Sequence, residues 1–290
     1  MQQKPIDPTR IILGKENRVY HLGLRSEEIA PLIFTVGDPE RVALFKKWFT
    51  SIELERVQRE FKTITGMRNG KRFSVMSTGM GADNIEIVMN ELDLLFNWNL
   101  DKLERRIGSL KPKIVRIGTS GSIQSSLPVD AILCSTSAFS FDAVHYFYPT
   151  NLSNSELSKA LSKHLDAWPL PSVFAFDNPE AKKFMQKATH FYEGITYSAS
   201  GFYSPQGRFW LKDKMPWENL PLHLSQFEWQ HKKITNIEME TCAIYHLGGI
   251  FGFETLSLSA ILANRLEGIF STQPEKTINK LIENAFDLCL

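Results

Sequence analysis

The chain has 290 residues, which is enough for one large α/β domain or two small ones with a substantial core and no disulfides. Its 33 lysines and arginines nearly balance 32 aspartates and glutamates, so no overall charge favours nucleic acid or a membrane surface as a partner. Three widely spaced cysteines fit neither a disulfide framework nor a C-x-x-C metal pair. The sequence has no metal-ligand motif, no signal peptide and no apolar run of about 18 residues. We therefore expect a cytoplasmic protein without a metal.

The apolar pattern alternates between strand-like and helix-like segments. Strands are expected at residues 32–36, 59–66, 73–78, 131–134, 195–200 and 255–263, and in the β-branched run 113–123, which ends in a glycine-rich turn. Helices are expected to begin at Pro39, capped by Asp38, and to cover residues 83–95, 155–165, 242–253 and 275–290. The basic stretch 99–113 is expected to be a solvated loop or helix end. This order predicts a mostly parallel sheet in a single domain, 1–290, with residues 1–18 as an N-terminal arm.

Arg116 is unusual because it lies within the apolar strand expected at 113–123, which is predicted to end in a turn containing Gly118 and Gly121. Burial of a guanidinium is unfavourable unless an anion meets it. A phosphate or carboxylate ligand would provide that anion. A neighbouring Asp or Glu would do so equally well, and the position alone does not choose between them.

Ligands of open parallel sheets bind beyond the carboxyl ends of the strands, so the turns there are the expected site. Arg41 and Arg116, with Thr119 and glycine amides, would form a compact oxyanion site typical of phosphate binding. The sequence lacks both the P-loop and the dinucleotide fingerprint.

Two further pairs of residues could bind the rest of a ligand. Glu238 and Glu240 are two apart, which on an extended segment directs both carboxylates to one face, as ribose hydroxyls would require. The same spacing would arise if the two acids merely stabilised the start of the following helix. A catalytic carboxylate pair of a glycosidase is a less suitable explanation, because those two acids must flank the scissile bond and would not lie in one short segment. Gln206 and Arg208, in a loop opened by Phe202, could read the edge of a nucleobase, or form a surface ion pair beside a packed Phe.

Together these segments resemble the uridine phosphorylase branch of the trimeric and hexameric nucleoside phosphorylase family. The matching segments, in family order, are Tyr20-His21-Leu22-Gly23-Leu24, Val36-Gly37-Asp38-Pro39-Glu40-Arg41-Val42, Arg59-Glu60-Phe61, Ser77-Thr78-Gly79-Met80-Gly81, Arg116-Ile117-Gly118-Thr119-Ser120-Gly121, Phe202-Tyr203-Ser204-Pro205-Gln206-Gly207-Arg208, Glu238-Met239-Glu240 and Asn264-Arg265. The resemblance implies a three-layer α/β/α sandwich around a twisted, partly barrel-like mixed central sheet.

The resemblance also implies roles for individual residues. Phosphate would be held by Gly37, Arg41, Arg59 from a neighbouring subunit, Arg116 and Thr119. Ribose would be held by His21, also from the neighbour, Glu238, Met239 and Glu240, and the base by Phe202, Gln206, Arg208 and Arg265. Arg116, Glu240 and Arg208 would be the catalytic residues. The implied reaction is attack of inorganic phosphate, a co-substrate, on the anomeric carbon of a pyrimidine nucleoside, uridine above all.

The family pattern is not matched everywhere. Ala82-Asp83-Asn84 replaces the Gly-Pro-Ser type of segment that helps to form a monovalent-cation site between subunits, so no cofactor is expected and cation binding is not supported. Purine-specific relatives usually carry an Asp near the strand end occupied here by Asn264.

The resemblance implies a homo-oligomer, a dimer or a hexamer, with shared active sites. The alternatives are a purine or broad-specificity phosphorylase, a hydrolytic nucleosidase, and a noncatalytic nucleoside-binding protein.

Overall fold

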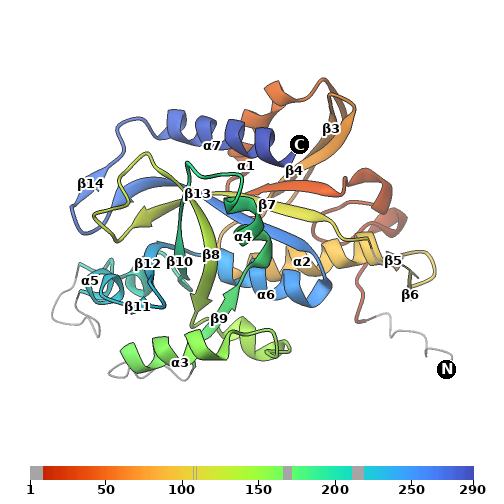
Figure 1. Ribbon diagram of the computed structural model, residues 1–290. Coiled ribbons are helices and arrows are strands. Elements are labelled where there is room, and N and C mark those ends of the chain that lie inside the picture. The colour runs from red at the N-terminus through yellow and green to blue at the C-terminus, as the bar shows by residue number, and fades with distance from the viewer. Residues whose placement is uncertain (1–8, 107, 109, 166–171, 211–218) are drawn as a thin grey trace. The chain divides into compact units, whose positions relative to one another are not determined.

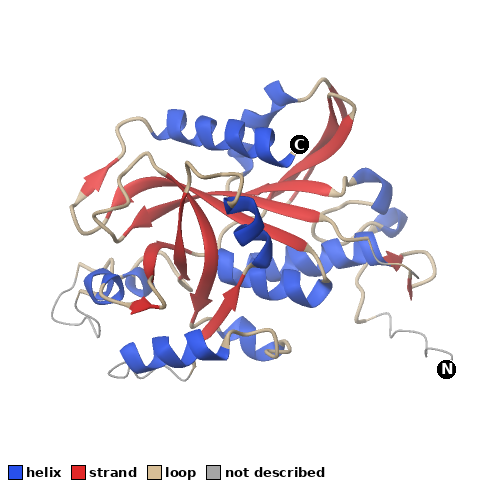
Figure 2. Ribbon diagram, viewed as in Figure 1, coloured by secondary structure: helices blue, strands red, loops and turns tan. Residues whose placement is uncertain are grey.

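The computed structural model describes residues 9–106, 108, 110–165, 172–210 and 219–290. Residues 1–8 of the expected arm therefore lie outside the described residues. The chain divides into two compact units, the first comprising Met1–Val115 with Phe251–Glu254 and the second Arg116–Ile250 with Thr255–Leu290. Figures 1 and 2 show the helices and strands of each unit. The extent of the domain, 1–290, stays a prediction.

The first unit contains a four-stranded sheet in the order β1-β4-β3-β2. Its strands are β1 (Leu32–Val36), β2 (Ser51–Gln58), β3 (Phe61–Arg68) and β4 (Lys71–Ser77), and its helices are α1 (Pro39–Val42) and α2 (Ala82–Asn97). Short 3-10 turns cover Lys15–Asn17, Ser26–Glu28 and Ala43–Trp48, and β5 (Trp98–Asn99) pairs with β6 (Glu104–Arg105). β1 and β4 are parallel, whereas β2, β3 and β4 form antiparallel hairpins.

Local chemistry explains these elements. The β3–β4 turn consists of Asn69 and Gly70, both with positive φ (49° and 76°), the conformation that a two-residue hairpin turn requires. At the start of α1, the Asp38 side chain accepts a hydrogen bond from the Glu40 amide at 2.8 Å, which confirms the predicted cap. The ladder β5–β6 places two short strands within the stretch 99–113, where a loop or helix end was expected.

The second unit contains a closed barrel of five strands in the order β7-β13-β8-β10-β12, with β12 pairing back to β7. The strands are β7 (Lys113–Ser122), β8 (Ile132–Ser140), β10 (Tyr192–Ser198), β12 (Lys232–Glu238) and β13 (Glu254–Asn264). Three short strands, β9 (Phe174–Asp177), β11 (Glu228–Trp229) and β14 (Ile269–Phe270), pair antiparallel with β8, β12 and β13 respectively. The helices are α3 (Ser155–His164), α4 (Pro179–Met185), α5 (Leu220–Ser225), α6 (Thr241–Phe251) and α7 (Pro274–Cys289), with 3-10 turns at Ala143–Phe147 and Ser204–Gln206.

Most of the expected elements are confirmed, but the sheet is mixed and not mostly parallel, because β2–β3, β3–β4, β7–β12 and β8–β13 pair antiparallel. The helices expected at 83–95, 155–165, 242–253 and 275–290 correspond to α2, α3, α6 and α7. The predicted glycine turn after Arg116 is wrong, because β7 continues through Gly118 and Gly121 to Ser122. Barrel closure explains the difference, since Gly121 and Ser122 pair with Ile237 and Asn236 of β12.

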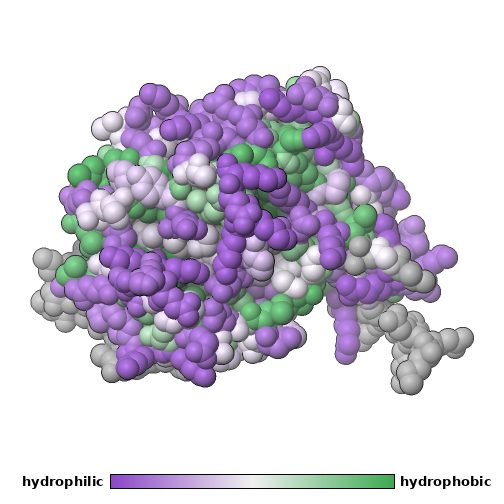
Figure 3. Space-filling view, viewed as in Figure 1, coloured by the Kyte–Doolittle hydropathy of each residue, from purple (hydrophilic) through white to green (hydrophobic). Residues whose placement is uncertain are grey.

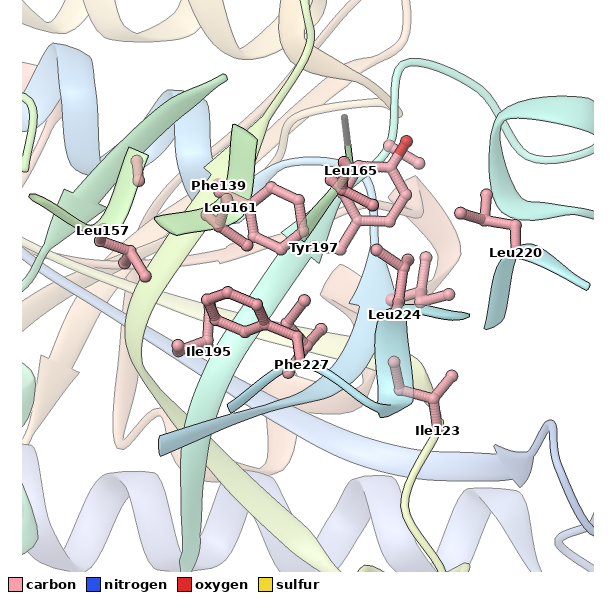
Figure 4. Packing of buried hydrophobic residues seen from close by; sticks show 14 residues of the cluster. Ile123, Phe139, Leu157, Leu161, Leu165, Ile195, Tyr197, Leu220, Leu224 and Phe227 are labelled. Carbon is pink, nitrogen blue, oxygen red and sulfur yellow. The ribbon is translucent and has the colours of Figure 1, made fainter. Parts of the chain in front are cut away.

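The core of the second unit lies between the barrel strands and helices α3 and α5. Phe139 of β8 stacks on Tyr197 of β10, with ring centroids 5.1 Å apart, and Figure 4 shows leucines of α3 and α5 among the same cluster. These side chains are almost completely removed from water, which is the dominant stabilising contribution to a core of this kind. Hydrophilic residues predominate on the face seen in Figure 3. No helix among the described residues is sufficiently long and apolar to cross a membrane.

Two histidines of the second unit form a buried pair. The Nδ1 atoms of His145 and His246 are 2.9 Å apart, and His246 Nε2 lies 2.8 Å from the carbonyl oxygen of Pro149. A carbonyl oxygen only accepts, so His246 carries its proton at Nε2 and accepts from His145 at Nδ1. His145 Nε2 is buried without a partner. Burial, together with the neighbouring His246, lowers the pKa of His145 to about 3, and burial lowers the pKa of His246.

This pair predicts that the protein loses stability in mild acid. In the unfolded chain His145 would bind a proton below about pH 6.5, whereas in the folded chain it stays neutral down to about pH 3. The unfolded state therefore binds more protons in this window, and the free energy of unfolding falls as the pH falls. By pH 5 His145 should account for about 2 kcal/mol. Urea denaturation at pH 7 and pH 5 measures the loss. The loss of stability between pH 7 and pH 5 should be smaller in His145→Phe and unchanged when the exposed His231 is replaced by Gln. An equal loss in the parent protein and both variants would show that His145 is not its source.

Candidate active site

The buried charge at the centre of the site is the guanidinium of Arg116, on β7. Its Nη2 atom lies 2.9 Å from Glu238 Oε2 and 2.6 Å from Glu240 Oε2, and Nη1 lies 3.4 Å from Ser259 Oγ. Burial alone lowers the pKa of Arg116, but the two carboxylates outweigh that effect and the net pKa is raised. The paired carboxylates anticipated as one alternative for Arg116 are therefore present. Two negative charges on one positive charge leave this cluster with a formal charge of −1.

The two glutamates are held differently. Glu238, the last residue of β12, accepts from the backbone amides of Glu240 and Thr241 at 2.9 and 3.1 Å, so it caps the start of α6. It also accepts from Ser198 Oγ at 2.5 Å. Glu240 lies between the strand and the helix, and its Oε2 accepts from Arg116 Nη2 at 2.6 Å. The helix-start explanation thus holds for Glu238, while both carboxylates also face one cation, as the spacing of two residues predicts.

Arg116 depends on a glycine two residues further along β7. A Cβ atom at Gly118 would lie 1.8 Å from Arg116 Nη1, so any other residue there would displace the guanidinium. Gly118 is therefore needed for packing of the side chain and not for a turn. Thr119 follows it in the same strand and is partly buried.

The predicted base-binding residues gather on the loop after β10 and at the end of β13. The Arg208 guanidinium lies over the ring of Phe202 at 4.1 Å, and Arg265 Nη1 donates to the backbone oxygen of Gln206 at 2.7 Å. Burial lowers the pKa of Arg208. Burial, followed by the charge of Arg208, lowers the pKa of Arg265 to about 10. Two partly desolvated guanidiniums thus lie near one loop.

Gln206 and Asn264 differ in how their side-chain amides are used. Gln206 is 3% exposed, and its side-chain amide has no hydrogen bond with the described part of the chain. Asn264 is fully engaged: its Nδ2 donates to the Gln124 oxygen at 3.0 Å and its Oδ1 accepts from the amides of Leu266 and Glu267 at 3.2 Å. Asn264 therefore fixes the turn after β13, and the role of Gln206 at the base stays a prediction.

The remaining predicted residues belong to the first unit. Gly37 follows β1 and Arg41 lies on α1. Arg59 is exposed in the β2–β3 turn with φ 54°, and its guanidinium donates to Tyr20 Oη at 3.1 Å. His21 pairs with Glu91, at 2.7 Å from Nδ1 to Oε1. The predicted phosphate-binding set is thus divided between the two units, and as a set it stays a prediction, as does Met239 at the ribose.

Sequence reasoning overlooked Ser198, Ser259 and Glu91. Ser198 gave little signal, because a serine at a strand end is common. Glu91 did give one, since an acidic residue lies among the apolar residues Val88, Leu92 and Leu95 that α2 buries. An acid in such a position indicates a specific partner, because burial of an unpaired carboxylate is unfavourable.

The closed barrel with flanking helices defines an α/β protein, and its buried arginine lies between two glutamates at the end of a barrel strand. Residues 31–290 match the family model of the Phosphorylase superfamily. The chain belongs to that family and has the α/β fold of the nucleoside phosphorylases, as expected.

Individual relatives fall into two groups. The chain is 26% identical to a uridine phosphorylase of Thermococcus kodakarensis, over 90% of this chain and 83% of the relative. It is also 26% identical to a DeoD-type purine nucleoside phosphorylase of Geobacillus kaustophilus, over 93% of this chain and 97% of the relative. A crystal structure of a Trypanosoma brucei nucleoside phosphorylase, described as showing uridine phosphorylase activity, matches with a TM-score of 0.83 and 27% identity, over 95% of this chain and 98% of that one.

The arrangement around Arg116 predicts how the second unit responds to loss of the cation. Arg116→Met should lower the free energy of unfolding by about 3 to 5 kcal/mol, because two buried carboxylates lose their partner. Adding Glu240→Gln should restore part of the loss, because it removes one of the unpaired charges. Urea denaturation of the single and double variants gives the comparison. A double variant less stable than Arg116→Met would show that Glu240 is stabilised independently of Arg116.

Proposed function

We propose that the protein catalyses phosphorolysis of a pyrimidine nucleoside, uridine above all, to the free base and ribose 1-phosphate. The observation that carries this proposal is the loop after β10, where Arg208 lies over the ring of Phe202 and Arg265 holds the backbone of the largely buried Gln206. The loop thus presents an aromatic face, a side-chain amide and two guanidiniums close to one another. Uracil presents alternating carbonyl and N–H groups, which match an amide and a guanidinium.

Asn264 favours a pyrimidine over a purine. A carboxylic acid at this strand end would be able to protonate a purine ring nitrogen, whereas an amide has no such proton to give. Both ends of the Asn264 amide are already occupied by the backbone of the turn. Charge stabilisation on the pyrimidine then falls to Arg208 and Arg265.

The catalytic step follows from the charges. As the glycosidic bond lengthens, positive charge grows on the anomeric carbon and negative charge on the base. Glu238, Met239 and Glu240 hold the ribose, Phe202 packs near it, and Arg208 stabilises the base anion. Phosphate, bound by Gly37, Arg41, Arg59, Arg116 and Thr119, attacks the anomeric carbon. Because the two carboxylates leave the Arg116 cluster with a formal charge of −1, the charges of Arg41 and Arg59 are needed to attract the anion.

The proposal includes an assembly. His21 and Arg59 act in the site of a neighbouring subunit, with His21 meeting the 5′-hydroxyl, so the protein works as a homo-oligomer, a dimer or a hexamer, in the cytoplasm. Neither a nucleic acid nor a membrane is a partner. Phosphate is a co-substrate, and no cofactor takes part. Binding of a monovalent cation is not part of the proposal.

A nucleoside panel with and without inorganic phosphate tests the activity. Uridine, deoxyuridine, thymidine, inosine and adenosine are incubated with the enzyme and base release is followed by ultraviolet absorbance. We expect phosphate-dependent release of uracil from uridine and little release of purine. Base release without phosphate would indicate a hydrolase. Preferred turnover of inosine or adenosine would indicate a purine enzyme, and binding without turnover a noncatalytic protein.

Arg208 should determine the choice of base. Arg208→Ala is expected to lower kcat/KM for uridine by roughly 10- to 1000-fold, since it removes a partly desolvated charge from the developing base anion. The KM for phosphate should change far less. Lys187→Ala, at an exposed site in the same unit, is the control and should leave both values unchanged. An unaltered preference for uracil in Arg208→Ala would remove the base-binding assignment.

A further inference from the structure

Glu91 is a charged residue in the buried face of α2. It is 6% exposed and lies between Val88 and Leu92, both completely or almost completely buried. Burial of a carboxylate is unfavourable unless donors satisfy it. A leucine or methionine there would suit the apolar face better. The acid therefore needs a reason that core packing does not supply.

All three donors that satisfy Glu91 come from one short segment. Oε1 accepts from the backbone amide of His21 at 2.8 Å and lies 2.7 Å from His21 Nδ1, and Oε2 accepts from the amide of Leu22 at 2.8 Å. Its one ion-pair partner among the described residues is His21. Glu91 thus fixes both the backbone and the ring of His21.

These contacts determine where the imidazole carries its proton. Each carboxylate oxygen accepts from a backbone N–H, so Glu91 acts as an ionised acceptor. Nδ1 of His21 must then be the donor, and in the neutral ring Nε2 is left with a lone pair. The His21 side chain is 30% exposed, so that a ligand can reach it, and Nε2 has no hydrogen bond within the described chain.

We propose that Glu91 is the positioning residue of the reaction: it holds His21 with the proton on Nδ1, so that Nε2 accepts a hydrogen bond from the 5′-hydroxyl of the nucleoside. This inference rests on the proposed function for the identity of that hydroxyl. The geometry of Glu91 and His21 does not depend on it. Glu91 itself does not touch the substrate, because its oxygens are occupied by His21 and Leu22.

The first experiment needs no substrate. Long-range proton–nitrogen correlation spectra in alkaline buffer, where imidazole is neutral, report which ring nitrogen of His21 is protonated. The signal is assigned with His21→Gln. We expect protonation at Nδ1 in the parent protein and a shift toward Nε2 in Glu91→Gln, because the amide can no longer accept from all three donors. Protonation at Nε2 in the parent protein would overturn the proposal.

A matched control separates this effect from damage to α2. Asp93 is a second buried acid of the same helix, 7% exposed, and it accepts from Asn97 Nδ2 at 2.7 Å and Trp98 Nε1 at 3.1 Å. Asp93→Asn removes a buried charge without touching His21. Its His21 spectrum should match that of the parent protein. A change as large as that in Glu91→Gln would show that the ring responds to the helix and not to Glu91.

The second experiment measures the consequence for catalysis. The ratio of kcat/KM for uridine to that for 5′-deoxyuridine reports the contact with the 5′-hydroxyl. A hydrogen bond of ordinary strength predicts that Glu91→Gln lowers this ratio about fivefold to tenfold, with Asp93→Asn unchanged. In a His21→Ala background, Glu91→Gln should have almost no further effect on the ratio.

The outcomes distinguish this inference from the proposed function. If the parent enzyme releases uracil with phosphate but Glu91→Gln keeps the parent ratio, the proposed function stands and the role of Glu91 is overturned. If the parent enzyme releases no pyrimidine, the proposed function fails, and the 5′-hydroxyl of a nucleoside is no longer the expected partner of His21 Nε2. The spectra still decide whether Glu91 determines which ring nitrogen of His21 carries the proton.

Discussion

The structure of the second unit depends on one buried charge. Arg116 lies on a barrel strand, and Glu238 and Glu240, with Ser259, offset the cost of its burial. Three local features follow from it. Position 118 must be glycine, because a Cβ would overlap the guanidinium. β12 must end where its last carboxylate reaches Arg116, and pairing of β12 with β7 closes the barrel at that side. The charge and the barrel closure therefore constrain each other.

The same carboxylates also connect the barrel to α6. Glu238 accepts from the amides of Glu240 and Thr241, and Ser198 Oγ donates to Glu238 while accepting from the amide of Cys242. One acid thus has a structural role at the helix start and an electrostatic role at Arg116. These two explanations compete when only the spacing of two glutamates is known. In the folded chain they are compatible, because a carboxylate has four lone-pair positions to share.

The sequence predicted most helices and four of the five barrel strands, all except β12, since hydrophobic periodicity is a local property. It failed where pairing between distant segments decides the outcome. Gly118 and Gly121 look like a turn in isolation, but the strand continues past them to the pairing of Gly121 and Ser122 with Ile237 and Asn236, which closes the barrel. β2 was not expected, because its largely exposed strand carries a weak apolar pattern. At the site, the sequence identified Arg116, Glu238 and Glu240 as charged candidates. It did not show whether Arg116 faces an acid or a ligand, because that depends on distances between residues far apart in the chain.

Overall similarity does not determine which base this chain prefers, because the uridine and purine phosphorylases quoted above are each 26% identical to it. Specificity depends instead on a few polar groups whose burial makes a wrong partner costly. In the proposed function Gln206 is such a group, since it is 3% exposed and lies on the loop that carries Arg208, whereas the amide of Asn264 is used by the protein itself. A base that leaves Gln206 unpaired loses more than a hydrogen bond, because the desolvated amide keeps its penalty. For that reason the loop after β10, and not the barrel common to the family, is where the preference for a base should be decided.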